Sequence, residues 1–341
     1  DDKLNNINQR YKKKIINFKQ IPKALFDYVI ISPGIDFKKC RLKKYLIKNY
    51  EKIISDFDVF YFSNPDNKLI TITGTNGKST TAKLIYDILK ICKSDVRLVG
   101  NIGKPILNEK RISKKTIFVV EASSYQIQYS KYFKTDVAIF LNIHPDHLER
   151  HETFLNYFNA KFQIIKNLKK NGFLIIPKKN KIIKKALKTN KIKKEILISS
   201  ANISKKILQN INNKYFTNKN NQENLCFALK LAHRLKCSQK NILKAVNSFK
   251  PLPFRNQMIF NNKKMSIIND SKSTSFSSSI NLLKSYKNIY WLVGGIAKKN
   301  DKLKLERKYY KNIKAYIYGR DKFFFQKKFK NKIKFKYSNH I

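Results

Sequence analysis

The chain lacks the features that mark secreted and membrane-spanning proteins. Its four cysteines form no C-x-x-C pair, which is typical of reduced thiols in a cytosolic protein. No apolar run approaches the roughly 18 residues that a membrane span needs. The first residue is Asp1 rather than Met, and the opening stretch is polar, unlike a signal peptide. We therefore expect a cytoplasmic protein without a membrane partner, clipped at its start.

Acidic residues are also scarce. The chain has 22 Asp and Glu against 73 Lys and Arg, a formal net charge of +51. Such an excess is typical of nucleic-acid-binding proteins, but the lysines are spread along the whole chain among Asn and Ile. All three residue types have A/T-rich codons, so genome composition explains the excess. We expect no nucleic-acid partner, and a basic nucleic-acid-binding protein remains the alternative from a different functional class.

A short glycine-containing loop is the most informative feature of the sequence. Residues 69–73 have the composition of a buried parallel strand, and residues 80–90 have the apolar spacing of a helix. Between them, Gly74 and Gly77 allow a turn whose backbone N–H groups point inward. This strand–loop–helix unit predicts a phosphate-binding site.

Two side chains of this loop suit a nucleotide. Lys78 is expected to place its ammonium on the outer phosphates, and the Ser79 hydroxyl is a suitable ligand for Mg²⁺. Ile72 stands where the strict G-x-x-x-x-G-K-[ST] pattern has its first glycine, so an ordinary strand–turn–helix unit remains an alternative. The flanking strand and helix favour the nucleotide site.

Strands and helices alternate along most of the chain, which predicts an α/β fold on a mostly parallel sheet. Turn-rich residues 63–67 and the pair Pro251 and Pro253 mark two boundaries. We therefore expect units at residues 1–64, 65–250 and 251–341, while residues 178–220 are locally ambiguous. The expected strands are 26–32, 69–73, 116–121, 137–143, 173–176, 264–268, 289–293 and 315–318, and the expected helices are 80–90, 154–168, 224–235, 239–249 and 277–283.

Glu121 and His147 follow two of the expected strands. The carboxylate of Glu121 closes a strand at the edge that also carries the phosphate loop, where it suits Mg²⁺; a helix N-cap region is the alternative. The run from His144 to His151 has three histidines but no convincing fourth ligand for zinc. We expect His147 to hold Mg²⁺ or substrate, and His144 and His151 to lie on a helix surface.

Other candidate residues carry weaker signals. Lys161, on a helical stretch, is by itself one solvated lysine among many. Residues 269–274 lie between a strand and a helix, where Asp270 is placed to accept from ribose hydroxyls. Lys272 and Thr274 are placed to reach an anionic substrate. The alternative for this segment is a turn rich in helix-capping residues.

Taken in order, these segments resemble the Mur ligase family. The matching segments are residues 32–35, 73–80, 100–103, 121–126, 141–150, 157–161, 223–224, 252–255, 269–272 and 294–295. The phosphate loop is shared with folylpolyglutamate synthetases, whereas Gly-Asn-Ile-Gly at 100–103 and Asn-Asp-Ser-Lys at 269–272 favour the D-glutamate-adding branch. The resemblance implies a central P-loop domain between two Rossmann-like domains, both truncated here.

The resemblance also implies an activity. This activity is ATP-dependent amide-bond formation through an acyl phosphate, with ATP and Mg²⁺ as cofactors and UDP-N-acetylmuramoyl-L-alanine and D-glutamate as substrates. It further implies a monomer. The residues before Phe26 lack the family's Gly-rich turn, and the family continues beyond Ile341. Another Mur ligase, a folylpolyglutamate synthetase or an inactive remnant are therefore alternatives.

Site residues follow from the resemblance position by position. It implies catalytic roles for Lys78, His147 and Lys161, with Lys161 carbamylated. The implied metal ligands are Ser79, Glu121, His147 and the carbamylated Lys161. The implied ATP contacts are Gly74, Thr75, Asn76, Gly77, Lys78, Ser79, Thr80, Asn224, Arg255 and Asp270. The implied substrate contacts are Asn101, Ser123, Lys272, Thr274 and Lys298.

Overall fold

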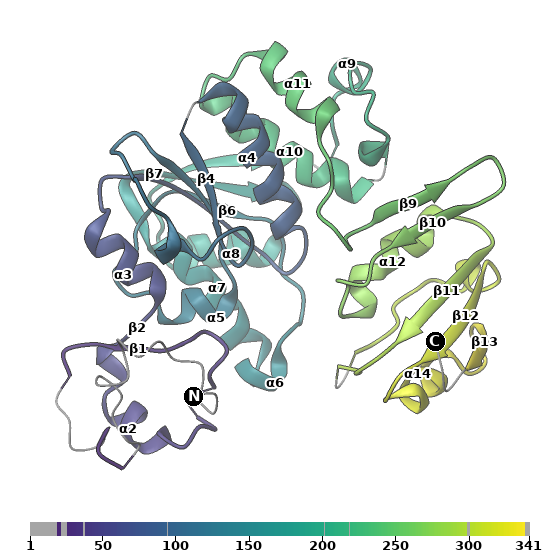
Figure 1. Cartoon of the computed structure of the whole chain (residues 1–341), viewed down its shortest axis with the longest axis horizontal. Helices are drawn as coiled ribbons and strands as arrows, with labels where there is room; N and C mark the ends of the chain where they lie inside the picture. The colour runs from purple at the N-terminus through teal and green to yellow at the C-terminus, as the bar shows by residue number, and fades with distance from the viewer. Residues whose placement is uncertain are drawn as a thin grey trace.

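A six-stranded, fully parallel sheet forms the centre of the protein (Figure 1). The computed structural model describes residues 19–21, 26–36, 38–93, 95–200, 202–217, 219–298 and 301–337. The strand order in the sheet is β4-β5-β3-β6-β7-β8. The strands are β3 (Lys68–Thr73), β4 (Val96–Gly100), β5 (Ile117–Glu121), β6 (Thr135–Phe140), β7 (Leu168–Pro177) and β8 (Glu195–Ser199).

Helices cover both faces of this sheet, because its strands are apolar on both sides. Leu69 packs into the core on one face, whereas Ile70 and Ile72 pack into the core on the other. One face is covered by α4 (Lys78–Cys92), α10 (Lys219–Arg234) and α11 (Gln239–Ser248). The other is covered by α3 (Asp56–Ser63), α5 (Ser124–Tyr129), α7 (Phe154–Lys166) and α8 (Lys181–Thr189). Shorter elements of this region are η4 (Ile106–Asn108), α6 (Leu148–His151), α9 (Lys205–Leu208) and η5 (Lys214–Thr217).

The N-terminal part is small and packs against α5. Its elements are β1 (Val29–Ile30), α2 (Lys43–Lys48), η3 (Tyr50–Lys52) and β2 (Ile53–Ile54), with β1 and β2 parallel. Tyr129, at the end of α5, is buried together with Ile31, Leu46 and Ile53. This small core joins the N-terminal part to the central sheet.

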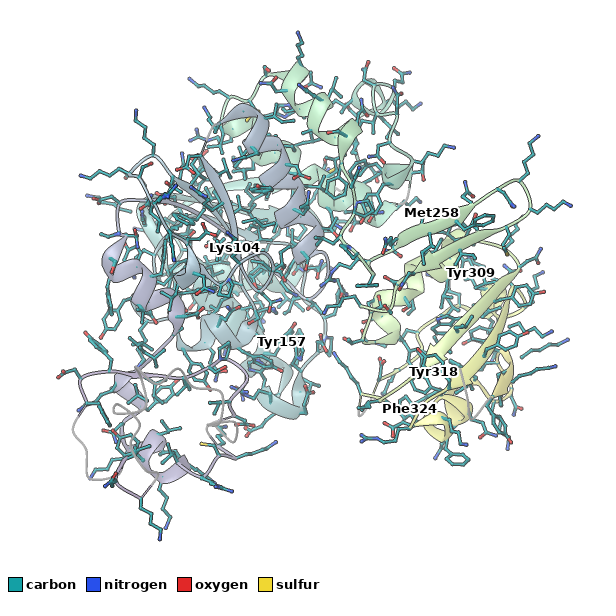
Figure 2. The ribbon with its side chains drawn as sticks, in the orientation of Figure 1. Lys104, Tyr157, Met258, Tyr309, Tyr318 and Phe324 are labelled. Atoms are coloured by element: carbon teal, nitrogen blue, oxygen red, sulfur yellow. The ribbon has the colours of Figure 1, made fainter. Side chains whose placement is uncertain are left out.

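The C-terminal part contains two further sheets (Figure 1). Strands β9 (Gln257–Asn261) and β10 (Ser266–Asn269) form an antiparallel pair. Strands β11 (Ile289–Gly294), β12 (Ile313–Tyr318) and β13 (Lys334–Tyr337) are parallel, and they are accompanied by α12 (Phe276–Ser285), α13 (Arg307–Tyr310) and α14 (Lys322–Phe329). Figure 2 places Tyr309, Tyr318 and Phe324 here and Tyr157 in the central part. No helix of the described ranges is long and apolar enough to cross a membrane.

The expected α/β alternation and parallel sheet are confirmed, with corrections to individual elements. The strand expected over 26–32 is reduced to β1, and the helix expected over 154–168 ends at Lys166 because β7 begins at Leu168. The ambiguous stretch contains α8, β8 and α9. The sequence did not predict strands β2, β4, β9 and β13.

The strand register explains where the loops converge. Glu121, at the end of β5, lies beside Ile72 of β3 and beside Gly100 of β4. Thr73 of β3 pairs with Phe140 of β6 on the other side. The chain builds β4 and β5 on one side of β3 and β6 to β8 on the other, and ligands bind outside such a reversal point. The loops that follow β3, β4, β5 and β6 therefore share one edge of the sheet.

Candidate functional site

The loop after β3 is held in shape by Asn142, and the Asn224 side chain lies against it. The Asn142 side-chain oxygen accepts hydrogen bonds from the backbone N–H groups of Thr75 (3.2 Å) and Asn76 (2.9 Å). Gly77 has a φ of 84° and precedes the first residue of α4. A Cβ at Gly77 would collide with the Asn224 side chain. Only glycine therefore fits this position, on grounds of both conformation and space.

The first turn of α4 presents Lys78, Ser79 and Thr80 to the same edge. Backbone N–H groups at a helix N-terminus lack intrahelical partners and favour an anion. Lys78 Nζ donates to the carbonyls of Gly74 (3.0 Å) and Thr75 (2.9 Å). Burial lowers the pKa of Lys78, and the carboxylates of Glu121 and Asp146 oppose that shift. The loop thus has the backbone and the cation that a phosphate requires.

Glu121 is fully buried and only half satisfied. Its Oε1 atom accepts a hydrogen bond from Asn101 Nδ2 at 2.8 Å. Its Oε2 atom is buried without a hydrogen-bond partner among the described residues. A buried carboxylate oxygen of this kind is costly unless a cation or donor completes it. The charge of Glu121 acts on both Lys78 and Lys161, so these three side chains share one electrostatic environment.

This orphaned oxygen fits a magnesium site. Mg²⁺ prefers one or two carboxylates together with phosphate oxygens and water. The buried Ser79, in the first turn of α4, is the hydroxyl that accompanies such a site. Across the described residues, no three His, Cys, Asp or Glu side chains are grouped to hold a metal ion by themselves. Phosphate and water would therefore supply most of the ligands.

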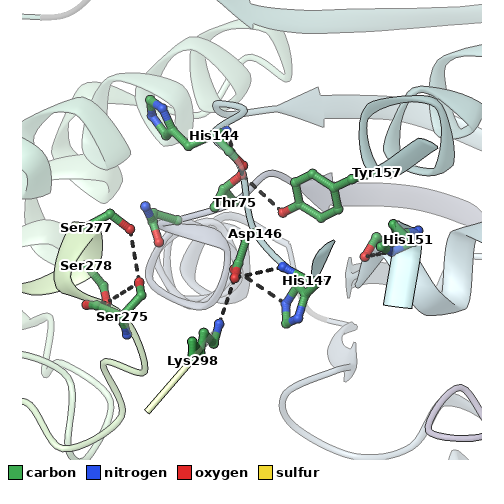
Figure 3. A network of polar contacts seen from close by, with 12 residues as sticks. Thr75, His144, Asp146, His147, His151, Tyr157, Ser275, Ser277, Ser278 and Lys298 are labelled. Carbon is green, nitrogen blue, oxygen red and sulfur yellow. Dashed lines mark hydrogen bonds and ion pairs between the residues drawn. The ribbon is translucent and has the colours of Figure 1, made fainter. Parts of the chain in front are cut away.

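His147 precedes α6 and lies beside an ion pair that joins two parts of the chain (Figure 3). Asp146 Oδ1 is 2.7 Å from Nζ of Lys298, and Asp146 Oδ2 is 3.5 Å from Nε2 of His147. Lys298 follows β11 in the C-terminal part. Burial lowers the pKa of His147, with Asp146 opposing the shift. The imidazole is therefore neutral at neutral pH and can accept a proton or bind a metal.

Lys161 is buried at 1% exposure, so its interpretation as a solvated surface lysine is wrong. Its Nζ lies 5.0 Å from the centre of the Tyr157 ring. The Tyr157 hydroxyl lies 3.1 Å from Oγ1 of Thr75, which ties α7 to the phosphate loop. Burial and the charge of Lys78 hold the pKa of Lys161 well below its ordinary value. This environment favours the neutral, nucleophilic amine over the ammonium.

The other two histidines of the 144–151 run, His144 and His151, differ in burial. His144 is exposed, as expected, but it lies in the loop after β6 and not on a helix. His151 is buried, so its expected surface position is wrong. Its ring stacks on Tyr125 at 5.4 Å, and its Nε2 lies 3.0 Å from the Ser124 hydroxyl. The helix α6 turns this residue inward against α5, which spacing in the sequence does not reveal.

Among the expected ATP contacts, Asn224 and Arg255 lie near the loop. The Asn224 side-chain oxygen accepts from Oγ1 of Thr81 in α4 (3.3 Å). Arg255, from the C-terminal part, is close enough to lower the pKa of Lys78 by charge repulsion. Asp270 is occupied locally, accepting from the N–H of Asn256 (3.0 Å) and the hydroxyl of Ser273 (2.6 Å).

The structure brings only some of the expected substrate contacts to the site. Asn101 lies at the site through its bond to Glu121. Ser123 caps α5, since its hydroxyl accepts from the N–H of Gln126 at 3.2 Å. Lys272 and Thr274 are exposed between β10 and α12, and of the C-terminal substrate candidates Lys298 is the one that reaches the central part.

Sequence reasoning assigned no role to Asn142, Asp146 or Tyr157. Asn142 and Asp146 follow β6, so the rule that located Glu121 at a strand end also applied to them. For Tyr157 no local signal distinguishes it from a core tyrosine.

Comparisons with known proteins identify relatives of this chain. A family model described as the Mur ligase middle domain matches residues 72–246. The UDP-N-acetylmuramoylalanine--D-glutamate ligase of Rickettsia bellii is 33% identical over 346 residues, covering 95% of this chain and 76% of that protein. The protein of the same name from Francisella tularensis subsp. novicida is 34% identical over 325 residues, covering 93% of this chain and 75% of that protein.

Solved structures share the fold at lower identity. The MurF ligase from Thermotoga maritima in complex with ADP has a TM-score of 0.60 and 17% identity, covering 93% of this chain and 87% of that chain. A pseudomurein peptide ligase type C from Methanothermus fervidus has a TM-score of 0.59 and 18% identity, covering 95% of this chain and 78% of that chain. With the relatives above, these results establish that the chain belongs to the Mur ligase family.

Proposed function

We propose that this chain joins D-glutamate to UDP-N-acetylmuramoyl-L-alanine in peptidoglycan synthesis, with ATP converted to ADP and phosphate. Both relatives compared above carry D-glutamate ligation in their names, and each aligns with more than nine-tenths of this chain (95% and 93%). One structural observation is the main support for this ATP-dependent reaction. The buried Oε2 of Glu121 lacks a hydrogen-bond partner among the described residues, at the edge that also carries the phosphate loop.

In the first step, a carboxylate oxygen of the nucleotide-sugar substrate attacks the γ-phosphorus of ATP. The new O–P bond forms as the bond to the β-phosphate breaks, leaving an acyl phosphate and ADP. Negative charge moves onto the bridging oxygen and the β-phosphate, so fixed cations accelerate this step. We assign that role to Lys78, which exchanges its bonds to the Gly74 and Thr75 carbonyls for phosphate oxygens.

In the second step, the amine of D-glutamate attacks the acyl carbon and phosphate leaves. The attacking ammonium must first lose a proton, and the tetrahedral intermediate carries an oxyanion. Water receives this proton, because a neutral His147 that held magnesium through one ring nitrogen would carry a hydrogen on the other. The adjacent Asp146 orients the His147 ring. Lys298 brings a positive charge from the C-terminal part to the same place. We propose Lys272 and Thr274 as D-glutamate contacts after the two parts close further.

Ser79, Glu121 and His147 are the proposed magnesium ligands. The ion, when bound, neutralises charge on the phosphates. The residues Gly74 to Thr80, Asn224, Arg255 and Asp270 are the proposed ATP contacts, and Asn101 and Ser123 are the proposed contacts of the nucleotide-sugar. We propose functional units at residues 1–64, 65–250 and 251–341, acting as a cytoplasmic monomer.

We further propose that Lys161 is carbamylated. The neutral amine adds to carbon dioxide, forming an N–C bond and releasing one proton, and the product is an anion. Burial beside Lys78 lowers the pKa of the amine and so favours the unprotonated form, which this reaction requires. The anion would offset the positive charge of Lys78 and help to hold a second magnesium ion.

The test is phosphate release by the purified chain with ATP, UDP-N-acetylmuramoyl-L-alanine and one amino acid at a time. D-glutamate should support release, and L-glutamate, L-lysine and diaminopimelate should not. Lys78→Ala should lose turnover by about 10²–10³-fold, the scale of removing one electrostatic stabiliser of the transition state. Equal turnover with another amino acid would reject the D-glutamate assignment. Unchanged turnover in Lys78→Ala would reject the proposed role of the loop after β3 in binding phosphate.

A further inference from the structure

We propose that Arg150 is a positioning residue for the nucleotide-sugar substrate. It fixes the loop after β1, residues 32–36, against the helix that follows His147. The inference rests on the function proposed above. The Arg150 side chain donates to Gly34, Ile35 and Tyr129, none of which is a proposed ATP contact or metal ligand. Its effect should therefore be confined to one substrate.

The guanidinium of Arg150 holds the loop by its backbone. Its NH1 donates to the carbonyl of Gly34 at 3.3 Å, and its NH2 donates to the carbonyl of Ile35 at 2.5 Å. NH2 also donates to the Tyr129 hydroxyl at 3.1 Å, so the guanidinium bridges the loop and the end of α5. A forked contact of this kind fixes direction as well as distance, which a lysine does less well.

The loop is at a place where ligands bind. It follows β1, which pairs in parallel with β2, and loops after parallel strands line the ligand crevice of α/β folds. It closes on itself through a bond from the N–H of Ile35 to the carbonyl of Ser32 at 2.9 Å. Its position relative to the central sheet therefore determines the width of the space for a ligand between them.

Arg150 also packs against Tyr125, whose ring meets that of His147, a proposed magnesium ligand. The guanidinium carbon lies 4.8 Å from the centre of the Tyr125 ring, a cation–π distance. The same ring meets His147 edge-on at 5.1 Å and stacks on His151 at 5.4 Å. A continuous packed series thus runs from the loop through Arg150 and Tyr125 to His147.

Neighbouring contacts across this junction are weaker. Lys38 pairs with Glu152 at 2.9 Å, but both side chains are about half exposed. Exposed pairs contribute little, because water and salt screen them. A cavity of about 220 Å³ lies beside Arg150 and Tyr129, so a shorter side chain would be replaced by water without collapse of the packing. Changes at Arg150 should therefore move the loop while the fold persists.

The experiment compares Arg150→Gln and Arg150→Lys with the matched control Lys38→Ala. Calorimetry measures the Kd of UDP-N-acetylmuramoyl-L-alanine and of a non-hydrolysable ATP analogue, and steady-state kinetics give KM and kcat. Arg150→Gln should raise the Kd and KM for the nucleotide-sugar about tenfold, the scale of losing one charge-assisted hydrogen bond. The Kd for the ATP analogue and the thermal midpoint should stay unchanged. Arg150→Lys should recover part of the loss, and Lys38→Ala should resemble the unmodified chain.

The outcomes separate two failures. If the unmodified chain does not bind the nucleotide-sugar, the proposed function falls and this inference with it. If the unmodified chain binds and Arg150→Gln binds equally well, the positioning role alone is overturned. Equal weakening for both ligands together with a lower thermal midpoint would also overturn it, because that result indicates a general structural role.

Discussion

Asn142 and Asn76 are paired in both directions. The side-chain oxygen of Asn142 accepts from the N–H of Asn76 at 2.9 Å, and its Nδ2 donates to the carbonyl of Asn76 at 3.0 Å. The two residues are 66 positions apart, on the loops after β6 and β3. Since the pair satisfies both backbone groups at the centre of the phosphate loop, the loop is shaped before a nucleotide binds.

Asn142→Ala should therefore weaken ATP binding. Leaving a partly buried N–H unsatisfied costs about 1–3 kcal/mol, so the Kd for ATP should rise about tenfold. Asn142→Asp keeps the acceptor but adds a negative charge beside the phosphate loop, so it should weaken ATP binding more than Asn142→Ala. Calorimetry with a non-hydrolysable ATP analogue measures both. The control is Asn190→Ala, which removes an exposed helix-end bond to the carbonyl of Ala186. If Asn142→Ala bound ATP as tightly as this control, the proposed role of Asn142 in shaping the phosphate loop would be contradicted.

Local sequence was sufficient to predict β3, the loop and α4. The strand is apolar and the helix has regular apolar spacing, while Gly77 is required locally. By contrast, β4 and β13 depend on pairing with β5 and β12, and their own sequences contain charged residues. A strand stabilised mainly by its neighbours carries a weak local signal.

Residues of the candidate site were likewise predictable only where a local pattern determines their position. The position of Glu121 followed from its strand end, because a strand end is a local property. The burial of Lys161 and His151 depends on which side of α7 and α6 packs inward, and tertiary contacts decide that. The ion pair between Asp146 and Lys298 joins residues 152 positions apart, so no pattern within one segment predicts it.

Glu121→Gln tests the orphaned oxygen. The amide keeps the size of the side chain but removes the negative charge that a magnesium ion needs. Turnover should fall about 10²–10³-fold, and the Mg²⁺ concentration for half-maximal activity should rise. Phosphate release across a magnesium titration measures both quantities.

The control for Glu121→Gln is Glu109→Gln. Glu109 is also a largely buried carboxylate, 3.8 Å from a guanidinium nitrogen of Arg97. It should keep its activity and its magnesium dependence. Thermal unfolding of both variants separates a lost metal site from a lost fold, and wild-type magnesium dependence in Glu121→Gln would exclude Glu121 as a ligand.

Lys161→Ala tests the proposed carbamate. The variant should lose most turnover, because the anion that offsets Lys78 is gone. Acetate or formate at high concentration should restore part of the loss by occupying the vacated space as a carboxylate. Lys166→Ala, at an exposed position of the same helix α7, should keep full activity and show no response to acetate. Full activity of Lys161→Ala without added carboxylate would contradict the proposal.

His151 makes stability depend on pH in a defined window. Burial, together with the charges of His147, Lys161 and Arg150, lowers the pKa of His151 from 6.5 to about 4. Between these two values the unfolded chain binds more protons at this site than the folded chain, so stability falls as pH drops from 6.5 toward 4. The shift corresponds to about 3 kcal/mol of the free energy of unfolding, and this amount is fully lost once the pH falls below about 4. His151→Gln removes the ionisable group but can still bond to Ser124. Urea unfolding at several pH values should therefore show a shallower acid dependence in the variant, and parallel curves for the two proteins would mean that His151 is not the group responsible.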